Sequence, residues 1–358
     1  MIIKVASVVA LCGWFHATAV SAQRGAYAAC EDCRVEVINV GELSDRGNPM
    51  EFGDQVYLFG FGPMSLAVAS VVDPGKIGIF DRKGQFLAVF GRYGAGPEEF
   101  RSVLAVGMAG SDSALIVDVG NRRISVVGSE LRVVREIRLP GALPAIAVFN
   151  DGRYVMSGSL PNESGAGFAF HLFDRDGRYV KSFGGPSGPW ASGSDNGPLR
   201  RIVRAAGGNS FWAVSPQSYR LELWSSDGKM ISAFEEERPW MANTRKGNPY
   251  ETEPGSNVVG IAISDDVVWT VSHVADAGWH RGMAPKRADA PPEQAELDAL
   301  FDTVIEAIDI KNGALISASR DRRYLWPVAG ENLVYTLVPT ELGEPAVQLW
   351  TPRLVPPR

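Results

Sequence analysis

Short runs of alternating apolar and polar residues, separated by polar turns, dominate the chain from about residue 34 onward. Three segments repeat one pattern: FDRKGQFLAVFG (80–91), FDRDGRYVKSFG (173–184) and WSSDGKMISAF (224–234). In each, an aromatic residue ends one strand, a turn closes on a glycine, and a second alternating strand ends in phenylalanine. Glycine supplies the positive φ that a tight hairpin requires. The pattern therefore predicts a series of similar β-hairpins.

Two weaker copies extend this repeat. ISVVGSELRVVREIRL (124–139) has Leu131 in the place of the glycine, and AIDIKNGALISAS (307–319) keeps Gly313. Turn positions 84, 131, 177 and 228 are 47, 46 and 51 residues apart, and two further strand-like runs precede each hairpin. Four strands in roughly 40–50 residues is the size of a β-propeller blade.

The repeats predict an all-β fold, a six-bladed β-propeller with four-stranded antiparallel blades. We place the blades at residues 52–91, 103–139, 143–184, 199–235, 256–319 and 322–354 of a single domain, 34–354. The last blade lacks a convincing fourth strand, whereas RVEVINVGEL (34–43) is left over at the other end. Donating this segment to the last blade would close the ring and remove its open edges.

The longest departure from the repeat lies in blade five, where 85 residues separate turn positions 228 and 313. Residues 238–256 form a polar link rich in glycine and proline, and an insertion inside the blade covers about residues 275–305. This insertion predicts a short helix from about Pro292 to Phe301, with Leu297 and Leu300 on its apolar face. Long loops on a repetitive scaffold commonly carry binding functions.

Residues 1–22 predict a signal peptide. One lysine precedes an apolar run, and small residues lead to a cleavage position before Gln23. The run is shorter than the ~20 residues that a membrane span needs, so we expect no transmembrane segment in the mature chain. A cysteine that accepts a lipid usually follows a small residue, whereas Cys12 follows the bulky Leu11. For this reason we do not expect Cys12 to be lipidated. We therefore expect export, to the periplasm or out of the cell.

The formal net charge of −6 argues against a nucleic-acid partner, because phosphates would be repelled over most of the surface. Residues 23–33 form an N-terminal segment that contains CEDC. In an oxidising compartment Cys30 and Cys33 are expected to form a disulfide. Free thiols and a redox or metal role are the alternatives, although Arg34 stands where c-type haem attachment needs a histidine.

The stretch GRYGAGPEEF (91–100), followed by LIVDVGNRRISVV (115–127), resembles the NHL repeat. In that repeat a glycine-rich link precedes a strand that ends in Asp and a turn of the form N-x-R-I. The matching residues here are Asp118, Asn121, Arg123 and Ile124. We interpret Asp118 as a structural residue that holds this turn. The chain as a whole resembles the six-bladed, NHL-like propellers of exported bacterial proteins. The resemblance implies the fold; such propellers include lyases, lactonases and binding modules.

Candidate ligand-binding residues fall in the loops. Trp190, Trp240 and Trp279 lie in loops between or inside blades, where an exposed aromatic ring is a candidate contact for a sugar or peptide. Arg200 and Arg201 are candidates because they supply local positive charge. Packing of these tryptophans within the loops, and an ordinary solvated charge pattern for the arginines, are the alternatives.

Candidate metal ligands are His273, Asp276 and His280, which would converge if the loop folds back on itself. Solvent-facing or packed histidines are the alternative interpretation. The ends of the second strands form a ring too poor in ligands to hold a hard cation, namely Asp118, Ser157, Ser215 and Ser272.

These patterns together favour an exported, non-catalytic propeller that binds a protein, peptide or glycan. We expect a monomer without a cofactor. The alternative is a metal-dependent lyase or hydrolase of the propeller type.

Overall fold

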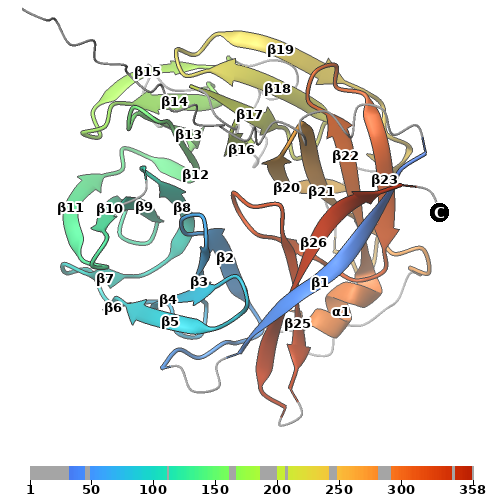
Figure 1. Ribbon diagram of the computed structural model, residues 1–358, viewed down its shortest axis with the longest axis horizontal. Coiled ribbons are helices and arrows are strands. Elements are labelled where there is room, and N and C mark those ends of the chain that lie inside the picture. Colours follow the sequence, from blue (N-terminus) through green and yellow to red (C-terminus); the bar gives the residue numbers. More distant parts are fainter. Residues whose placement is uncertain are drawn as a thin grey trace, which may run out of the picture.

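The structure is a computed structural model that describes residues 32–44, 49–110, 113–160, 167–185, 200–205, 209–241, 248–280, 292–340 and 343–356. The predicted signal peptide, Cys30 and Trp190 lie outside these ranges. Six four-stranded antiparallel sheets surround a central axis (Figure 1). The prediction of a six-bladed propeller with four-stranded blades is confirmed.

Five blades follow the chain from the innermost to the outermost strand. Their strands are β2 (Val56–Gly60), β3 (Ser65–Ser70), β4 (Ile77–Asp81) and β5 (Phe86–Phe90) in blade one; β8 (Val103–Met108), β9 (Ser113–Asp118), β10 (Arg123–Gly128) and β11 (Val133–Arg138) in blade two; β12 (Ala142–Val148), β13 (Tyr154–Ser159), β14 (Phe170–Phe173) and β15 (Tyr179–Phe183) in blade three; β16 (Arg201–Arg204), β17 (Ser210–Val214), β18 (Arg220–Ser225) and β19 (Met230–Glu235) in blade four; and β20 (Asn257–Ser264), β21 (Val267–Ala275), β22 (Phe301–Asp309) and β23 (Leu315–Asp321) in blade five.

The last blade combines both ends of the chain. It contains β24 (Trp326–Pro327), β25 (Val334–Pro339) and β26 (Pro345–Val355), and its outermost strand is β1 (Arg34–Ser44). β1 pairs with β26 in antiparallel register from Arg34 opposite Val355 to Ser44 opposite Ala346, and Figure 1 shows the two strands side by side. The predicted closure by an N-terminal strand is therefore confirmed.

The turn glycines of the repeated hairpins also contact the preceding blade. Gly84 has a φ of +92°, and a Cβ at this position would lie 1.9 Å from the carbonyl oxygen of Glu42 in β1. A Cβ on Gly228 would lie 2.8 Å from the ring of Phe183 in β15. Leu131, which replaces the glycine in blade two, still adopts a φ of +57° and packs into the apolar cluster between blades one and two. The repeat thus encodes both a turn and a contact between blades.

The glycine-rich link before blade two is held by the residues of the matching turn. Its short strands β6 (Arg92–Tyr93) and β7 (Glu99–Phe100) pair in parallel, and the Phe100 side chain is fully buried between blades. The Asp118 carboxylate accepts a hydrogen bond from the backbone N–H of Ser102 at 3.0 Å. Arg123 donates to the carbonyl oxygen of Gly96 at 2.8 Å. Asp118 therefore has the structural role that the sequence predicts.

The insertion of blade five contains one helix, α1 (Gln294–Leu300), between β21 and β22. Glu293 caps its first turn, in a capping box with Glu296, and Leu297 and Leu300 are buried. The helix is shorter than predicted because Phe301 is already the first residue of β22, where it pairs with Ala275.

Antiparallel blades place their connections on two faces. The links between blades and the loops between second and third strands lie at one end of the strands, which we call the link face. The turns between first and second strands, and between third and fourth strands, lie at the opposite end, the hairpin face. The insertion of blade five and the short 3-10 helix η2 (Pro239–Met241) therefore lie on the link face.

Candidate functional site

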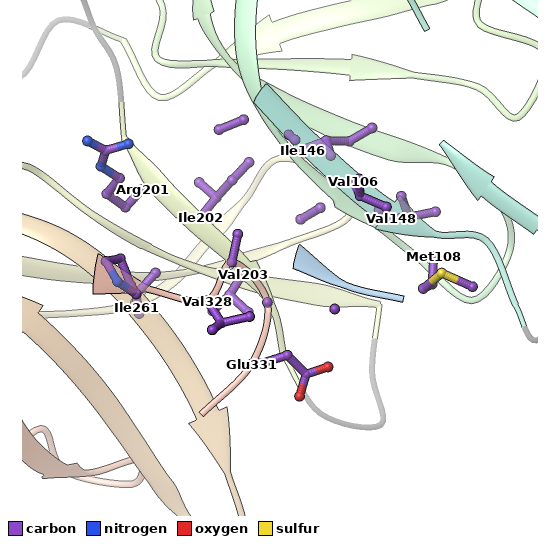
Figure 2. Close-up of a pocket in the computed structure, with 18 of the residues that line it drawn as sticks. Val106, Met108, Ile146, Val148, Arg201, Ile202, Val203, Ile261, Val328 and Glu331 are labelled. Atoms are coloured by element: carbon purple, nitrogen blue, oxygen red, sulfur yellow. The ribbon is translucent and has the colours of Figure 1, made fainter. Parts of the chain in front are cut away.

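The innermost strands of the six blades enclose a central cavity with a volume of about 520 Å³. Figure 2 shows its wall, which is mostly made of valine, isoleucine, alanine, proline and glycine, with Arg201 and Glu331 as the charged residues of the lining. Each of these innermost strands is an edge strand of its sheet, so the edge that has no neighbouring strand in the sheet faces the cavity. Some of the backbone groups on these edges are already paired, at the bridge between Phe59 and Ala329 and where the N–H of Val258 donates to the carbonyl oxygen of Pro216. Edge strands otherwise present backbone N–H and C=O groups.

Small residues let the innermost strands approach each other. A Cβ on Gly107 would lie 2.6 Å from a methyl group of Val148, and one on Gly260 would lie 2.4 Å from Pro327. The ends of the second strands do not line the cavity, because the innermost strands stand between them and the axis. Asp118, Ser157, Ser215 and Ser272 are instead buried within the blades. These four residues therefore do not contribute to the lining of this cavity.

Arg201 lies at the link-face end of the cavity, as the first residue of β16. Its Nε is fully buried and has no hydrogen-bond partner, and no ion pair of its guanidinium occurs among the described residues. Burial lowers the pKa of Arg201. A guanidinium nevertheless keeps its proton in proteins, so this end of the cavity has a positive charge that no described carboxylate compensates.

His273 and Tyr324 lie close to Arg201 but do not neutralise it. The two rings stack with centroids 3.7 Å apart, and Nε2 of His273 lies 3.0 Å from the carbonyl oxygen of Leu325. Burial, with a contribution from the Arg201 charge, lowers the pKa of His273 to about 4. Burial also raises the pKa of the Tyr324 hydroxyl. Both side chains are therefore uncharged at neutral pH.

The hairpin-face end of the cavity is electrostatically different. Glu331, in the turn between β24 and β25, forms an ion pair with Arg82 at 2.6 Å. Figure 2 shows Glu331 and Arg201 on different sides of the lining. Because Arg82 compensates the charge of Glu331, Arg201 is the charged group among the described lining residues that remains available to a charged ligand.

Arg200 does not join Arg201. It is buried, and its backbone N–H donates to Oγ of Ser157 at 2.7 Å. Burial lowers the pKa of Arg200, and the carboxylate of Glu222 acts in the opposite direction. The carboxylate of Glu222, inside blade four, thus acts to raise the pKa of Arg200, whereas Tyr324 acts to raise the pKa of Arg201, in both cases against the larger effect of burial.

Two of the predicted tryptophans are partly buried in the loops of the link face. Trp279 donates from Nε1 to the carbonyl oxygen of Pro249 at 2.9 Å, and this bond joins the insertion of blade five to the link before that blade. Trp240, in η2, packs edge-on against Tyr219 with ring centroids 5.5 Å apart. These contacts agree with the alternative interpretation of loop packing.

The predicted metal ligands occupy different environments. His273 is buried, whereas His280 is exposed and its Nδ1 lies 3.5 Å from the carbonyl oxygen of Gly278. Asp276 accepts a hydrogen bond from the N–H of Gly278 at 2.7 Å. Within the described part of the chain, no group of three His, Cys, Asp or Glu side chains lies close enough to hold a metal ion. The structure therefore does not bring these three residues together.

Asp276 forms a pair with a second carboxylate, that of Asp302, which sequence reasoning missed. Burial raises the pKa of Asp302, and Asp276 adds to this effect, whereas Arg320 at 2.5 Å from Asp302 opposes it. The N–H of Ala277 also donates to Asp302 at 3.3 Å. The pair fastens the beginning of the insertion to β22.

Cys33 is buried and disulfide-bonded. Cys30 lies outside the described residues, so its pairing with Cys33 stays a prediction. Across the described residues, no helix has the length and apolar character that a membrane span requires.

Comparisons with known proteins support the fold. No protein-family model matches the chain, and no curated protein matches it in sequence. A member of the DUF4221 family from Bacteroides vulgatus has a similar structure, with a TM-score of 0.60, 10% sequence identity, and coverage of 90% of this chain and 99% of that one. A putative exported protein from Bacteroides fragilis is similar, with a TM-score of 0.61, 10% identity, and coverage of 91% and 96%. At these identities the comparisons establish a β-propeller fold.

Proposed function

We propose that the chain is an exported, non-catalytic β-propeller module that binds a protein, peptide or glycan through its link face. The observation that carries the proposal is the hydrogen bond between Trp279 and Pro249, which joins two long loops of this face. A surface whose loops are already held in place loses less conformational entropy when a partner binds. The similarity in fold to a putative exported protein agrees with this proposal.

Additional contacts support a preorganised link face. Arg238 forms an ion pair with the buried Glu306 at 2.9 Å, and its guanidinium lies 4.6 Å from the ring centroid of Tyr219. Ser256 donates a hydrogen bond to the carbonyl oxygen of Trp240. The capped helix α1 adds a rigid element to the same loops.

Site-specific photocrosslinking in the cells that produce the protein tests this function. A photoreactive phenylalanine derivative replaces His280, which is exposed on the insertion, or Lys229, which is exposed on the hairpin face. We expect one defined adduct from position 280 and none from position 229. Equal adducts from both positions, or none from either, would contradict a partner site on the link face. The intact mass of the purified protein tests export, with Gln23 expected as the first residue.

A further inference from the structure

We propose that the central cavity binds the carboxyl terminus of a short apolar peptide, with the carboxylate paired to Arg201. This inference rests on the proposed function, because it names one chemical class among the partners that the module would bind. It concerns a different part of the molecule from the loops around Trp279.

The first argument is electrostatic. Burying a charged group without a partner is costly, and Nε of Arg201 is buried without a hydrogen-bond partner, while Tyr324 is the described residue that acts on its charge. A guanidinium forms two parallel hydrogen bonds with a carboxylate. A single guanidinium matches a ligand of charge −1, and the second charge of a phosphate would find no further cation among the described residues of the lining.

The second argument concerns the rest of the ligand. The wall of the cavity combines apolar side chains, such as Val106, Ile146 and Val203, with the inner edges of edge strands. An edge strand has backbone N–H and C=O groups available to pair with an added extended chain. A peptide offers both amide groups and small apolar side chains, whereas a sugar offers mainly hydroxyl groups that would lose their water on the apolar wall.

The third argument is size. A cavity of about 520 Å³ falls within the range of small-ligand sites and accommodates a few residues. Gly107 and Gly260 keep the inner strands close together, so an extended chain fits better than a branched or folded one. The site therefore favours a short peptide with small apolar side chains.

The experiment compares two peptides by isothermal titration calorimetry against the full mature protein. Both are N-acetyl-Ala-Val-Ala-Val, one with a free carboxyl terminus and one with a carboxamide. We expect the free acid to bind about tenfold to a hundredfold more tightly, because hydrogen bonds to charged groups are the stronger ones. Equal affinity for the two peptides, or no binding of either at millimolar concentration, would overturn the inference.

Two variants locate the carboxylate. R201M should reduce the affinity for the acid to that for the amide and leave the amide unchanged. R178M, at an exposed position on the hairpin face, should behave as the wild type. R201M removes a charged group whose buried Nε has no hydrogen-bond partner among the described residues, so its melting temperature should equal or exceed that of the wild type, and lost binding is then not attributable to unfolding. Retained preference for the acid in R201M would overturn the assignment.

A third ligand separates the peptide from its carboxylate. Octanoate has the same charge and an apolar chain but no amides, and we expect it to bind at least tenfold more weakly than the peptide acid. Equal binding would overturn the peptide part of the inference. The adduct at position 280 reports on the link face, so its presence without peptide binding contradicts only this inference, and the converse contradicts only the proposed function.

Discussion

Burial acts differently on the two basic side chains Arg201 and His273, which lie near each other in the propeller. The pKa of Arg201 is lowered, but a guanidinium retains its charge. The imidazole of His273 responds by losing its proton, since its pKa falls to about 4. One residue thus provides a charge for recognition, and the other becomes a neutral packing residue stacked on Tyr324.

The neutral state of His273 predicts a loss of stability in acid. The pKa falls from 6.5 to about 4 on folding, so the associated stability is present above pH 6.5 and is lost as the pH approaches 4. From pH 7 to pH 4.5 this residue should reduce the free energy of unfolding by about 2–3 kcal/mol. Urea unfolding at both pH values measures the change.

The matched variants are His273→Gln and His280→Gln. His273→Gln should show a smaller loss between the two pH values, by about the same 2–3 kcal/mol, whatever its stability at pH 7. The exposed His280→Gln should retain the pH dependence of the wild type. A wild-type pH dependence in His273→Gln would exclude a buried, neutral histidine as its cause.

At the scale of the element, each repeated hairpin serves as a turn and as a surface that contacts the preceding blade. Because of this double role, replacing the turn glycine should lower the free energy of unfolding by more than its positive φ alone explains. Gly84 and Gly343 have similar positive φ values, +92° and +80°. A Cβ at Gly84 would overlap the backbone of β1, whereas one at Gly343 would have no atom within 4 Å.

Gly84→Ala should therefore destabilise the protein more than Gly343→Ala. The φ penalty, roughly 1 kcal/mol, applies to both variants. The overlap with Glu42 adds about 1–3 kcal/mol at position 84 alone. The free energy of unfolding in urea, measured for both variants, gives the comparison. Equal losses would show that the contact with the preceding blade has no energetic weight.

The sequence predicts best those elements whose structure is determined by residues that are neighbours in the chain. Turn residues and strand alternation located all six blades, and Pro292 together with the apolar face of Leu297 and Leu300 located α1 to within two residues of its start. Leu131 also follows the repeat, since it keeps the positive φ of the glycine that it replaces.

The functional surfaces were harder to predict because their causes are not local. Which residues line the cavity depends on the arrangement of six strands from distant parts of the chain. Arg200 and Arg201 look equivalent in the sequence, yet only Arg201 lines the cavity. The partial burial of Trp279 likewise depends on Pro249, which lies in another loop.

At the scale of the whole molecule, the ring depends on one strand from the opposite end of the chain. β1 covers the outer edge of β26, and its Leu43 is fully buried in the cluster shared by the first and last blades. Without β1, the edge of β26 and this apolar cluster would both be exposed. An open ring with such an edge tends to associate with other chains.

A chain that begins at Pro49 should therefore melt about 10 °C or more below the mature protein and form oligomers in size-exclusion chromatography. A synthetic peptide of residues 32–44 should restore both properties when added in excess, because it supplies the missing strand. The same peptide with Leu43→Asp should fail, since the buried position does not accept an unpaired carboxylate. If the truncated chain stayed monomeric with an unchanged melting temperature, the remaining five complete blades and the three-stranded sheet would be sufficient for the fold. β1 would then stabilise the ring too weakly to account for its closure, and the N-terminal segment would be free for another role.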